Sequence, residues 1–197
     1  MTDLERALAT IAADLGALGA RFALVGGLAV AVRAEPRLTR DADLAVSVAG
    51  DAEAEAIVLG LQRRGHRVIA AVEQEAVARL STVRLSRSRR DDGAVTDLLF
   101  ASSGIEAEIV GRASVTAVLP ALVLPVASIA DLIAMKLLAR DDRRRPADAD
   151  DLRALAAAAS DDDWSLAERA VRLIEVRGFH RGRDLVALLG ELRSTTC

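Results

Sequence analysis

The chain is poor in the residues that mark secreted, membrane-spanning or base-stacking proteins. Its 197 residues include one cysteine, Cys197, so no disulfide can form within the chain, which fits a reducing compartment. Aromatic residues make up 2% and tyrosine is absent, so an aromatic platform for nucleic-acid bases is not expected. No apolar run reaches membrane-spanning length, and no basic-then-apolar signal opens the chain. We therefore expect a cytoplasmic protein with no membrane partner.

The charge and the histidine content bear on two further classes of protein, nucleic-acid coat proteins and histidine-based metal proteins. The net charge of −3 argues against a general nucleic-acid coat protein but leaves room for a local basic patch. The two histidines, His66 and His180, stand alone and show no metal-ligand spacing. The length allows one domain with a sizeable core, or one domain plus a small helical appendage.

The most informative stretch is Phe22–Val48, which has the pattern strand, glycine turn, helix, loop, strand. The first apolar run ends at Gly26 and Gly27, and the second begins just after Asp41 and Asp43. Residues two apart on a strand point the same way, so the two carboxylates converge on one site. Carboxylates held together repel unless a cation or a proton compensates them, and a divalent metal is the economical answer.

Each half of this pattern also has a plainer interpretation. A Gly-Gly pair is most often only a turn, and Asp-x-Asp at a strand end occurs by chance in many soluble proteins. The combination is more specific, because glycines that open a helix leave backbone N–H groups accessible to a phosphate. A phosphate cradle followed by a carboxylate pair suggests a nucleotide.

A resemblance to a known family rests on six residues: Gly26, Gly27, Arg37, Thr39, Asp41 and Asp43. They resemble the motif of the nucleotidyltransferase superfamily, the group related to DNA polymerase β. Within it the chain most resembles the AbiEii-like nucleotidyltransferase toxins, from about Arg21 to about Leu155. Many superfamily members carry Gly-Ser at the turn, so this chain lacks a hydroxyl that would help to hold a phosphate.

The fold that we expect is α/β, with a small mixed, mostly antiparallel sheet flanked by helices and a C-terminal helical part. The nucleotidyltransferase domain is expected over residues 1–126. Residues 127–197 are expected to form a helical region packed on it.

A third candidate carboxylate lies on a later predicted strand, 94–100. Asp97 is the one charged residue in this apolar strand, and a buried charge without a partner is costly. It therefore either faces water from an edge strand or joins Asp41 and Asp43. The resemblance favours the second interpretation and implies that this acid binds one metal and promotes deprotonation of the attacking hydroxyl. We expect the preceding turn, 87–93, to place its arginines at a solvated tip or against an anionic substrate.

Lys136 is the only lysine in the chain. By helical spacing it falls in the apolar stripe of a helix predicted over 128–140, which begins with the capping-type residues Ser128 and Asp131. Its ammonium could reach water along a packed stem, or it could be aimed at a triphosphate in a cleft. The resemblance favours the triphosphate, because the family has a lysine on the helix after the catalytic sheet.

The following segment opens another predicted helix at 145–151. Its acids suit a helix N-terminus through the helix dipole alone. The resemblance matches Arg145, Asp148 and Asp151, whereas Ala147 stands where the family usually has lysine.

The rest of the chain predicts a helical bundle. A capping box at Ser165 and Glu168 predicts one helix start, Gly178 predicts a stop, and a last helix is expected over 183–192. Five arginines could form either a basic face for a polynucleotide or an ordinary solvated surface: Arg169, Arg172, Arg177, Arg181 and Arg183.

These patterns, together with the resemblance, predict an enzyme that moves a nucleoside monophosphate from an NTP to an acceptor hydroxyl with two Mg²⁺ ions. The expected catalytic and metal-binding residues are Asp41, Asp43 and Asp97. The expected nucleotide-binding residues are Gly26, Gly27, Arg37, Thr39 and Lys136. The resemblance implies a toxin that acts on RNA, such as a tRNA end, and a cognate antitoxin protein. Two alternatives stay open: an aminoglycoside or lincosamide nucleotidyltransferase, and an inactive nucleotide- or partner-binding protein of the same fold.

Overall fold

The computed structural model describes residues 2–36, 39, 41–75, 77–87, 94–120, 122–140 and 147–195. The helices are α1 (Asp3–Ala17), α2 (Gly26–Arg33), α3 (Asp51–Arg63), α4 (Glu106–Arg112), α5 (Ile129–Ala139), α6 (Ala147–Ala158), α7 (Asp161–Val176) and α8 (Leu185–Ser194). The strands are β1 (Arg21–Val25), β2 (Asp41–Ser47), β3 (Arg67–Gln74), β4 (Arg79–Ser86), β5 (Val95–Leu99), β6 (Ser114–Leu119) and β7 (Leu122–Val126).

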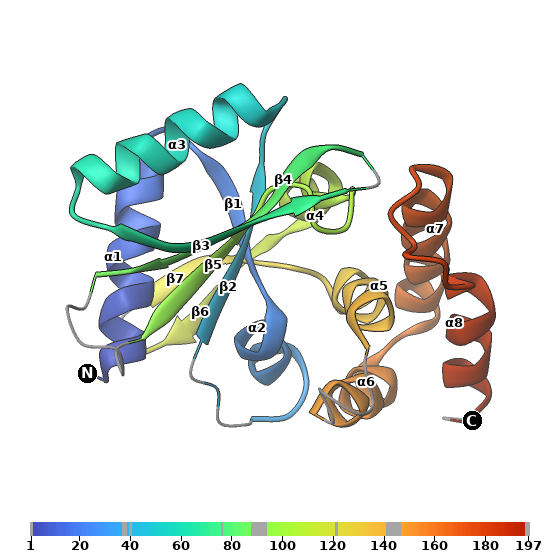
Figure 1. Cartoon of the computed structure of the whole chain (residues 1–197). Coiled ribbons are helices and arrows are strands. Elements are labelled where there is room, and N and C mark those ends of the chain that lie inside the picture. The colour runs from blue at the N-terminus through green and yellow to red at the C-terminus, as the bar shows by residue number, and fades with distance from the viewer. Residues whose placement is uncertain are drawn as a thin grey trace.

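The strands form one mixed sheet in the order β3-β4-β5-β2-β1-β7-β6. The pairs β2–β5 and β1–β7 are parallel, and the other neighbours are antiparallel. Figure 1 shows α1 and α3 together on one side of the sheet, with α5 to α8 grouped away from them. The expected α/β fold with a mixed, mostly antiparallel sheet and flanking helices is confirmed.

The sheet has strands that the sequence patterns do not predict. Neither β6 nor β7 is expected, because Pro120 and Pro125 interrupt the strand pattern there. The short helix α4 is likewise not expected. The strands that were predicted from apolar runs all form, and they include the neighbouring strands β2 and β5 that carry the acids.

The core includes the apolar face of α1. Leu8, Ile11 and Leu15 recur at helical spacing on α1 and are fully buried. The capping box of Thr2 and Glu5 fixes the start of this helix. No helix in the described ranges is long and apolar enough to cross a membrane.

Helix α7 begins earlier than the sequence analysis expects. Ser160 Oγ accepts a bond from Asp163 N at 3.2 Å, and Asp163 Oδ2 accepts one from Ser160 N at 3.0 Å. This capping box starts the helix, so the predicted start at Ser165 and Glu168 is wrong. Ser165 lies inside α7, where its hydroxyl donates to Asp161 O at 2.9 Å. Two overlapping capping patterns compete here, and the upstream one is also the one that puts Trp164 on the buried face of the helix.

The segment between α7 and α8 packs against α4 and the loop before it. Gly104 has φ +76°, and a Cβ at that position would lie 2.4 Å from Phe179 Cδ2, so the Phe179 ring packs directly on this glycine. Arg177 pairs with Glu108 of α4 at 2.6 Å. The division of the chain at residues 126 and 127 stays a prediction.

Candidate functional site

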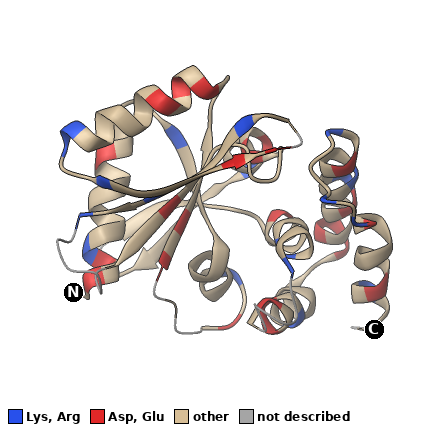
Figure 2. Cartoon of the chain, viewed as in Figure 1, with Lys and Arg blue, Asp and Glu red and all other residues tan. Residues whose placement is uncertain are grey.

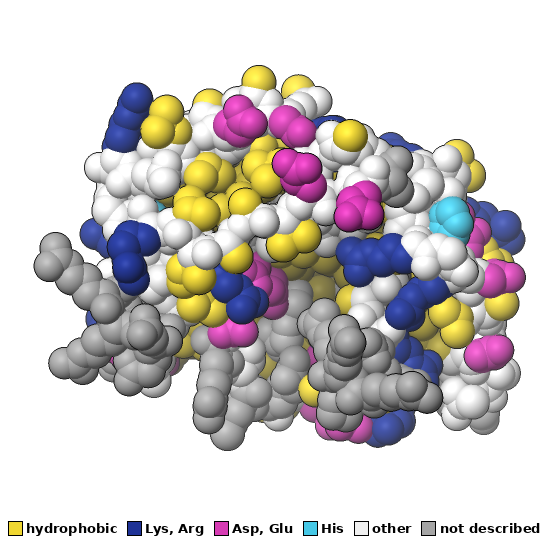
Figure 3. Space-filling model, viewed as in Figure 1, with side chains coloured by type: hydrophobic (Ala, Val, Ile, Leu, Met, Phe, Trp, Pro, Cys, Tyr) yellow, Lys and Arg dark blue, Asp and Glu magenta, His cyan; other side chains and the backbone are white. Residues whose placement is uncertain are grey.

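A pocket of about 860 Å³ lies between the sheet and the C-terminal helices. The residues that line it include all but one of the predicted site residues: Gly26, Gly27, Thr39, Asp41, Asp43, Asp97 and Lys136. The remaining one, Arg37, lies outside the described residues. Figure 3 shows the hollow, with Lys and Arg side chains gathered on its rim on the side of the C-terminal helices. Residues far apart in the sequence are therefore brought together, as the sequence analysis predicts.

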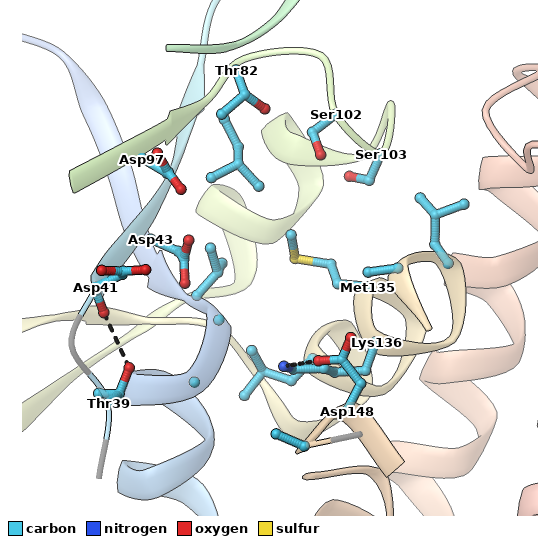
Figure 4. Close-up of a pocket in the computed structure, with 18 of the residues that line it drawn as sticks. Thr39, Asp41, Asp43, Thr82, Asp97, Ser102, Ser103, Met135, Lys136 and Asp148 are labelled. Carbon is cyan, nitrogen blue, oxygen red and sulfur yellow. Dashed lines mark hydrogen bonds and ion pairs between the residues drawn. The ribbon is translucent and has the colours of Figure 1, made fainter. Parts of the chain in front are cut away.

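The three predicted carboxylates share one wall of this pocket. Asp41 and Asp43 flank the fully buried Ala42 on β2, so their side chains emerge on the same face. Asp97 pairs with Asp43 in the parallel register of β2 and β5. Figure 4 shows the three side chains around one space, and Figure 2 shows the acids on these neighbouring strands within a largely uncharged sheet. Since β5 lies between β4 and β2, Asp97 is not on an edge strand.

Gly26 is required where β1 passes directly into α2. Its φ of +66° favours glycine, and a Cβ there would lie 1.9 Å from Asp43 Oδ2. The Asp43 carboxylate therefore rests on the bare backbone at the start of α2. Val25 occupies the N-cap and has no polar side chain to bond the first amides of the helix. This geometry joins the glycine turn and the carboxylate pair into one site.

Thr39 is the only described residue of the segment just before β2. Its hydroxyl donates to Asp41 O at 3.3 Å, a bond drawn in Figure 4. The side chain lines the pocket beside Asp41. It is thus placed next to the acids, and its predicted contact with a nucleotide stays a prediction.

Arg84 of β4 is a pocket residue that the sequence analysis missed. Its guanidinium donates two hydrogen bonds to the Asp97 carboxylate, from Nε to Oδ1 at 2.8 Å and from Nη2 to Oδ2 at 2.6 Å. The hydrogen bonds that Arg84 donates to Asp97 raise the pKa of Arg84 above its ordinary value, and the charges of Asp41 and Asp43 add to the increase. The sequence contains a signal for this pair, because Arg84 and Asp97 are equally distant from the midpoint between residues 90 and 91. In a symmetric hairpin such positions lie opposite each other, as they do in the structure.

Lys136 lies on the opposite wall, and its ammonium is buried between two acids of α6. Its Nζ is 2.7 Å from Asp148 Oδ1 and 2.6 Å from Asp151 Oδ2. The exposed fractions of the three side chains are 8%, 3% and 1% in that order. The lysine therefore does not reach water along its stem. Its predicted contact with a triphosphate stays a prediction, whereas its pairing with α6 is a feature of the fold.

Helix α5, which carries Lys136, is fixed by contacts at its N-terminus. Ser128 is the N-cap, as predicted, and its Oγ accepts a bond from Asp131 N at 3.2 Å. Asp131 also pairs with Arg112 at the end of α4. The cap fixes the start of α5, and the ion pair holds this start against the end of α4.

The pocket continues along a serine wall. Glu106 Oε1 accepts bonds from Ser102 N at 2.8 Å, Ser103 N at 2.7 Å and Ser103 Oγ at 2.9 Å. Burial raises the pKa of this carboxyl above its ordinary value. Arg181, from the loop between α7 and α8, donates to Ser102 O at 3.2 Å and lines the pocket. None of these residues was singled out for this wall in the sequence analysis.

Two of the five C-terminal arginines are paired with acids. Arg172 pairs with Glu168 at 2.7 Å and Arg177 with Glu108 at 2.6 Å. The latter bond lowers the pKa of Glu108 below its ordinary value. Of the five, Arg181 is the one that lines the pocket.

The acids fit a divalent cation by their chemistry. Carboxylate oxygens are ligands that Mg²⁺ accepts, and the Arg84 guanidinium already supplies positive charge among them. Within the described ranges, no three His, Cys, Asp or Glu side chains form a ready-made metal cluster. Of the three expected metal ligands, Asp97 has both carboxylate oxygens hydrogen-bonded to Arg84.

The chain is similar to one protein family and to several solved structures. One family model matches residues 6–195, and its description is nucleotidyl transferase AbiEii toxin, type IV toxin–antitoxin system. Among solved structures, the antibiotic-resistance factor ANT(2'')-Ia is 20% identical, with 95% of this chain and 90% of that chain covered and a TM-score of 0.48. JHP933 from Helicobacter pylori is 16% identical, with 98% and 88% covered and a TM-score of 0.48. No curated protein sequence matches the chain significantly.

Proposed function

Because the chain belongs to the AbiEii nucleotidyl transferase toxin family, we propose that it transfers a nucleoside monophosphate from an NTP to an acceptor hydroxyl and releases pyrophosphate. Nucleotidyl transfer is the activity after which this family is described. The NTP, the metal and the acceptor are the parts that this proposal adds.

One observation carries the proposal for this chain. The Asp43 carboxylate lies against Gly26 at the start of α2, within a pocket that Asp41 and Asp97 also line. A helix N-terminus without a polar cap suits a phosphate, and adjacent carboxylates suit a metal that bridges phosphates. A metal–nucleotide complex satisfies both requirements at once.

Each residue then has a defined part. Asp41, Asp43 and Asp97 would hold two Mg²⁺ ions, which when bound supply the charge that steadies the attacking oxygen, the α-phosphate and the leaving pyrophosphate. Gly26 and Gly27 admit the phosphates to the backbone amides at the start of α2. Asp97 favours loss of the proton from the attacking hydroxyl.

The cations would neutralise the triphosphate. Lys136 faces the acids across the pocket, and Arg37 and Thr39 precede β2, so we assign all three to nucleotide binding. For Lys136 this requires that part of its charge remain available beside Asp148 and Asp151. Thr39 offers its hydroxyl at the rim next to Asp41.

The acceptor that we propose is RNA, with a tRNA end as the first candidate, and the protein would act as a toxin counteracted by a cognate antitoxin protein. Support comes from the family description, which names a toxin–antitoxin system. Basic side chains on the rim of the pocket offer contacts for a polynucleotide backbone.

The direct test incubates the purified protein with each α-labelled NTP, Mg²⁺ and total tRNA. We expect label on RNA with the wild type, and a loss of more than about a thousandfold with Asp43→Asn, the scale of removing a residue essential in the transition state. Asp51→Asn is the matched control, because Asp51 bonds Arg79 away from this pocket and should keep full activity.

The other outcomes decide between the alternatives. Label that moves only to an aminoglycoside or a lincosamide would replace the toxin assignment with antibiotic modification. Full activity of Asp43→Asn would rule out the proposed mechanism. An absence of transfer to every acceptor would favour an inactive nucleotide- or partner-binding protein.

A further inference from the structure

The ion pair between Arg84 and Asp97 differs from an ordinary cross-strand pair in its location. Arg84 lies opposite Asp97 in the antiparallel register of β4 and β5. Its two parallel bonds, at 2.8 and 2.6 Å, occupy both carboxylate oxygens. Bidentate arginine–carboxylate pairs of this kind are strong and direction-specific. The carboxylate they occupy belongs to the candidate metal site.

The two partners are unequally exposed. The Asp97 side chain is 13% exposed, because β5 lies inside the sheet, whereas the Arg84 side chain is 44% exposed and lines the pocket. Asp97 is therefore fixed by its strand, and the long arginine side chain is the partner with room to turn. An exchange at this pair would move Arg84 and leave Asp97 in place.

The charges around Arg84 give the pair a second role. Asp41 and Asp43 contribute to the field at its guanidinium, so this cation interacts with three negative groups. Carboxylates held together without a cation repel one another. A divalent metal would supply the same compensation, and it needs the oxygens that the guanidinium now holds. Arginine and metal are therefore alternatives for Asp97.

We propose that Arg84 is a positioning residue that competes with divalent metal for Asp97 and releases this carboxylate when the phosphates of a nucleotide arrive to pair with the guanidinium. The inference rests on the proposed function. No bond is made or broken covalently: one ion pair is replaced by a metal–carboxylate contact and an arginine–phosphate contact. Phosphate accepts the same bidentate guanidinium fork that carboxylate does. The complete metal site would then assemble only with substrate.

The test is binding of Mn²⁺ alone, measured by the loss of the free-ion electron paramagnetic resonance signal in the absence of nucleotide. We expect Arg84→Gln to bind Mn²⁺ about tenfold or more tightly than the wild type, because it removes a positive charge within contact distance of the site. The gain should disappear in Arg84→Gln/Asp97→Asn. Arg84→Lys, which keeps the charge without the fork, should fall between the two.

Arg79→Gln is the matched control. Arg79 lies on the same strand and holds Asp51 with an Nε–Oδ1 distance of 2.6 Å, but it does not line this pocket. Its removal should leave Mn²⁺ affinity unchanged. A second arm adds a non-hydrolysable NTP analogue, and there the wild type should bind the nucleotide more tightly than Arg84→Gln. Circular dichroism confirms that each variant is folded.

The outcomes separate the two levels of the argument. Equal Mn²⁺ affinity of wild type and Arg84→Gln, with binding lost in Asp43→Asn, would overturn the role of Arg84 and keep the proposed metal site. Mn²⁺ binding that is unaffected by Asp43→Asn, or no binding by any variant, would overturn both. Unchanged affinity for the NTP analogue in Arg84→Gln would reject the transfer of the guanidinium to phosphate.

Discussion

Two groups of charges face each other across the pocket, and they differ in their access to water. The sheet-side cluster consists of Arg84, Asp97, Asp41 and Asp43. The helix-side cluster consists of Lys136, Asp148 and Asp151. The arginine side chain is 44% exposed, and the lysine side chain is 8% exposed. The same chemistry, a cation beside several acids, is thus found once with an exposed cation and once with a buried one.

The difference teaches which charges are exchangeable. A buried ion pair leaves an uncompensated charge when one partner is lost, whereas water and ions can replace the partner of an exposed charge. The helix-side cluster joins α5 to α6 and is part of the fold. In the sheet-side cluster a metal ion can replace the Arg84 guanidinium, and a site for metal and nucleotide needs such an exchange.

The largest effect on stability is expected from Lys136→Met. This change removes the buried ammonium that both Asp148 and Asp151 contact, and losing one partner of a buried pair costs about 3–5 kcal/mol. Urea denaturation measures the change in the free energy of unfolding. Arg153→Met on α6, the helix that carries Asp148 and Asp151, is the control, because its pair with Asp150 is 71% exposed on both sides and should matter little. A Lys136→Met variant as stable as the wild type would contradict the contrast between the clusters.

A smaller loss of stability is expected from Gly26→Ala, with a strong effect on the sheet-side cluster. The new Cβ would meet Asp43 Oδ2 at 1.9 Å on a backbone with positive φ, so both strain and a displaced carboxylate follow. We expect a cost of about 1–3 kcal/mol and loss of metal-dependent nucleotide binding. Gly190→Ala on α8 has no atom within 4 Å of the new Cβ and should be neutral or stabilising. Retained nucleotide binding in Gly26→Ala would show that Asp43 does not need this position.

Arg84→Gln should change stability by less than about 1 kcal/mol, since its side chain is 44% exposed and exposed pairs contribute little. The measurement is the same urea titration, compared with Lys136→Met in one buffer. A loss as large as that of the lysine variant would make Arg84 a structural residue and remove the distinction between the two clusters.

The smallest effect concerns the serine wall between the clusters. Burial raises the pKa of Glu106 above its ordinary value of 4.5, so the folded protein holds this proton more tightly than the unfolded chain does. The stability it contributes is fully present below the unfolded pKa and is lost as pH rises through the folded pKa. Glu106→Gln keeps an oxygen acceptor and cannot ionise, so its free energy of unfolding should fall less steeply from acid to neutral pH. Parallel slopes for the two proteins would contradict this assignment.

The sequence predicts the parts of the site that depend on local geometry. Spacing by two placed Asp41 and Asp43 on one face of a strand, and the glycine pair marked the turn beside them. Ser128 marked the start of α5 through its capping chemistry. These features depend on neighbours within a few residues, so a single sequence suffices to infer them.

The parts that were missed depend on contacts between distant segments. The partners of Lys136 come from the packing of α5 on α6, and a helical pattern says only which face is apolar. Arg84 required the register between β4 and β5, two strands that a charged stretch of sequence connects. Ser160 and Ser165 both offer capping patterns, and the choice between them depends on which start buries the right face of α7. Tertiary packing decides each of these cases.

The most direct measurement of the central claim is calorimetric titration of each NTP into the purified protein, with and without Mg²⁺. The comparison is with an Asp41→Asn/Asp43→Asn double variant. The account predicts saturable, Mg²⁺-dependent binding of at least one NTP by the wild type and none by the double variant. Equal binding by both proteins, or no binding of any NTP by the wild type, would contradict the assignment of the sheet-side cluster as a metal–nucleotide site.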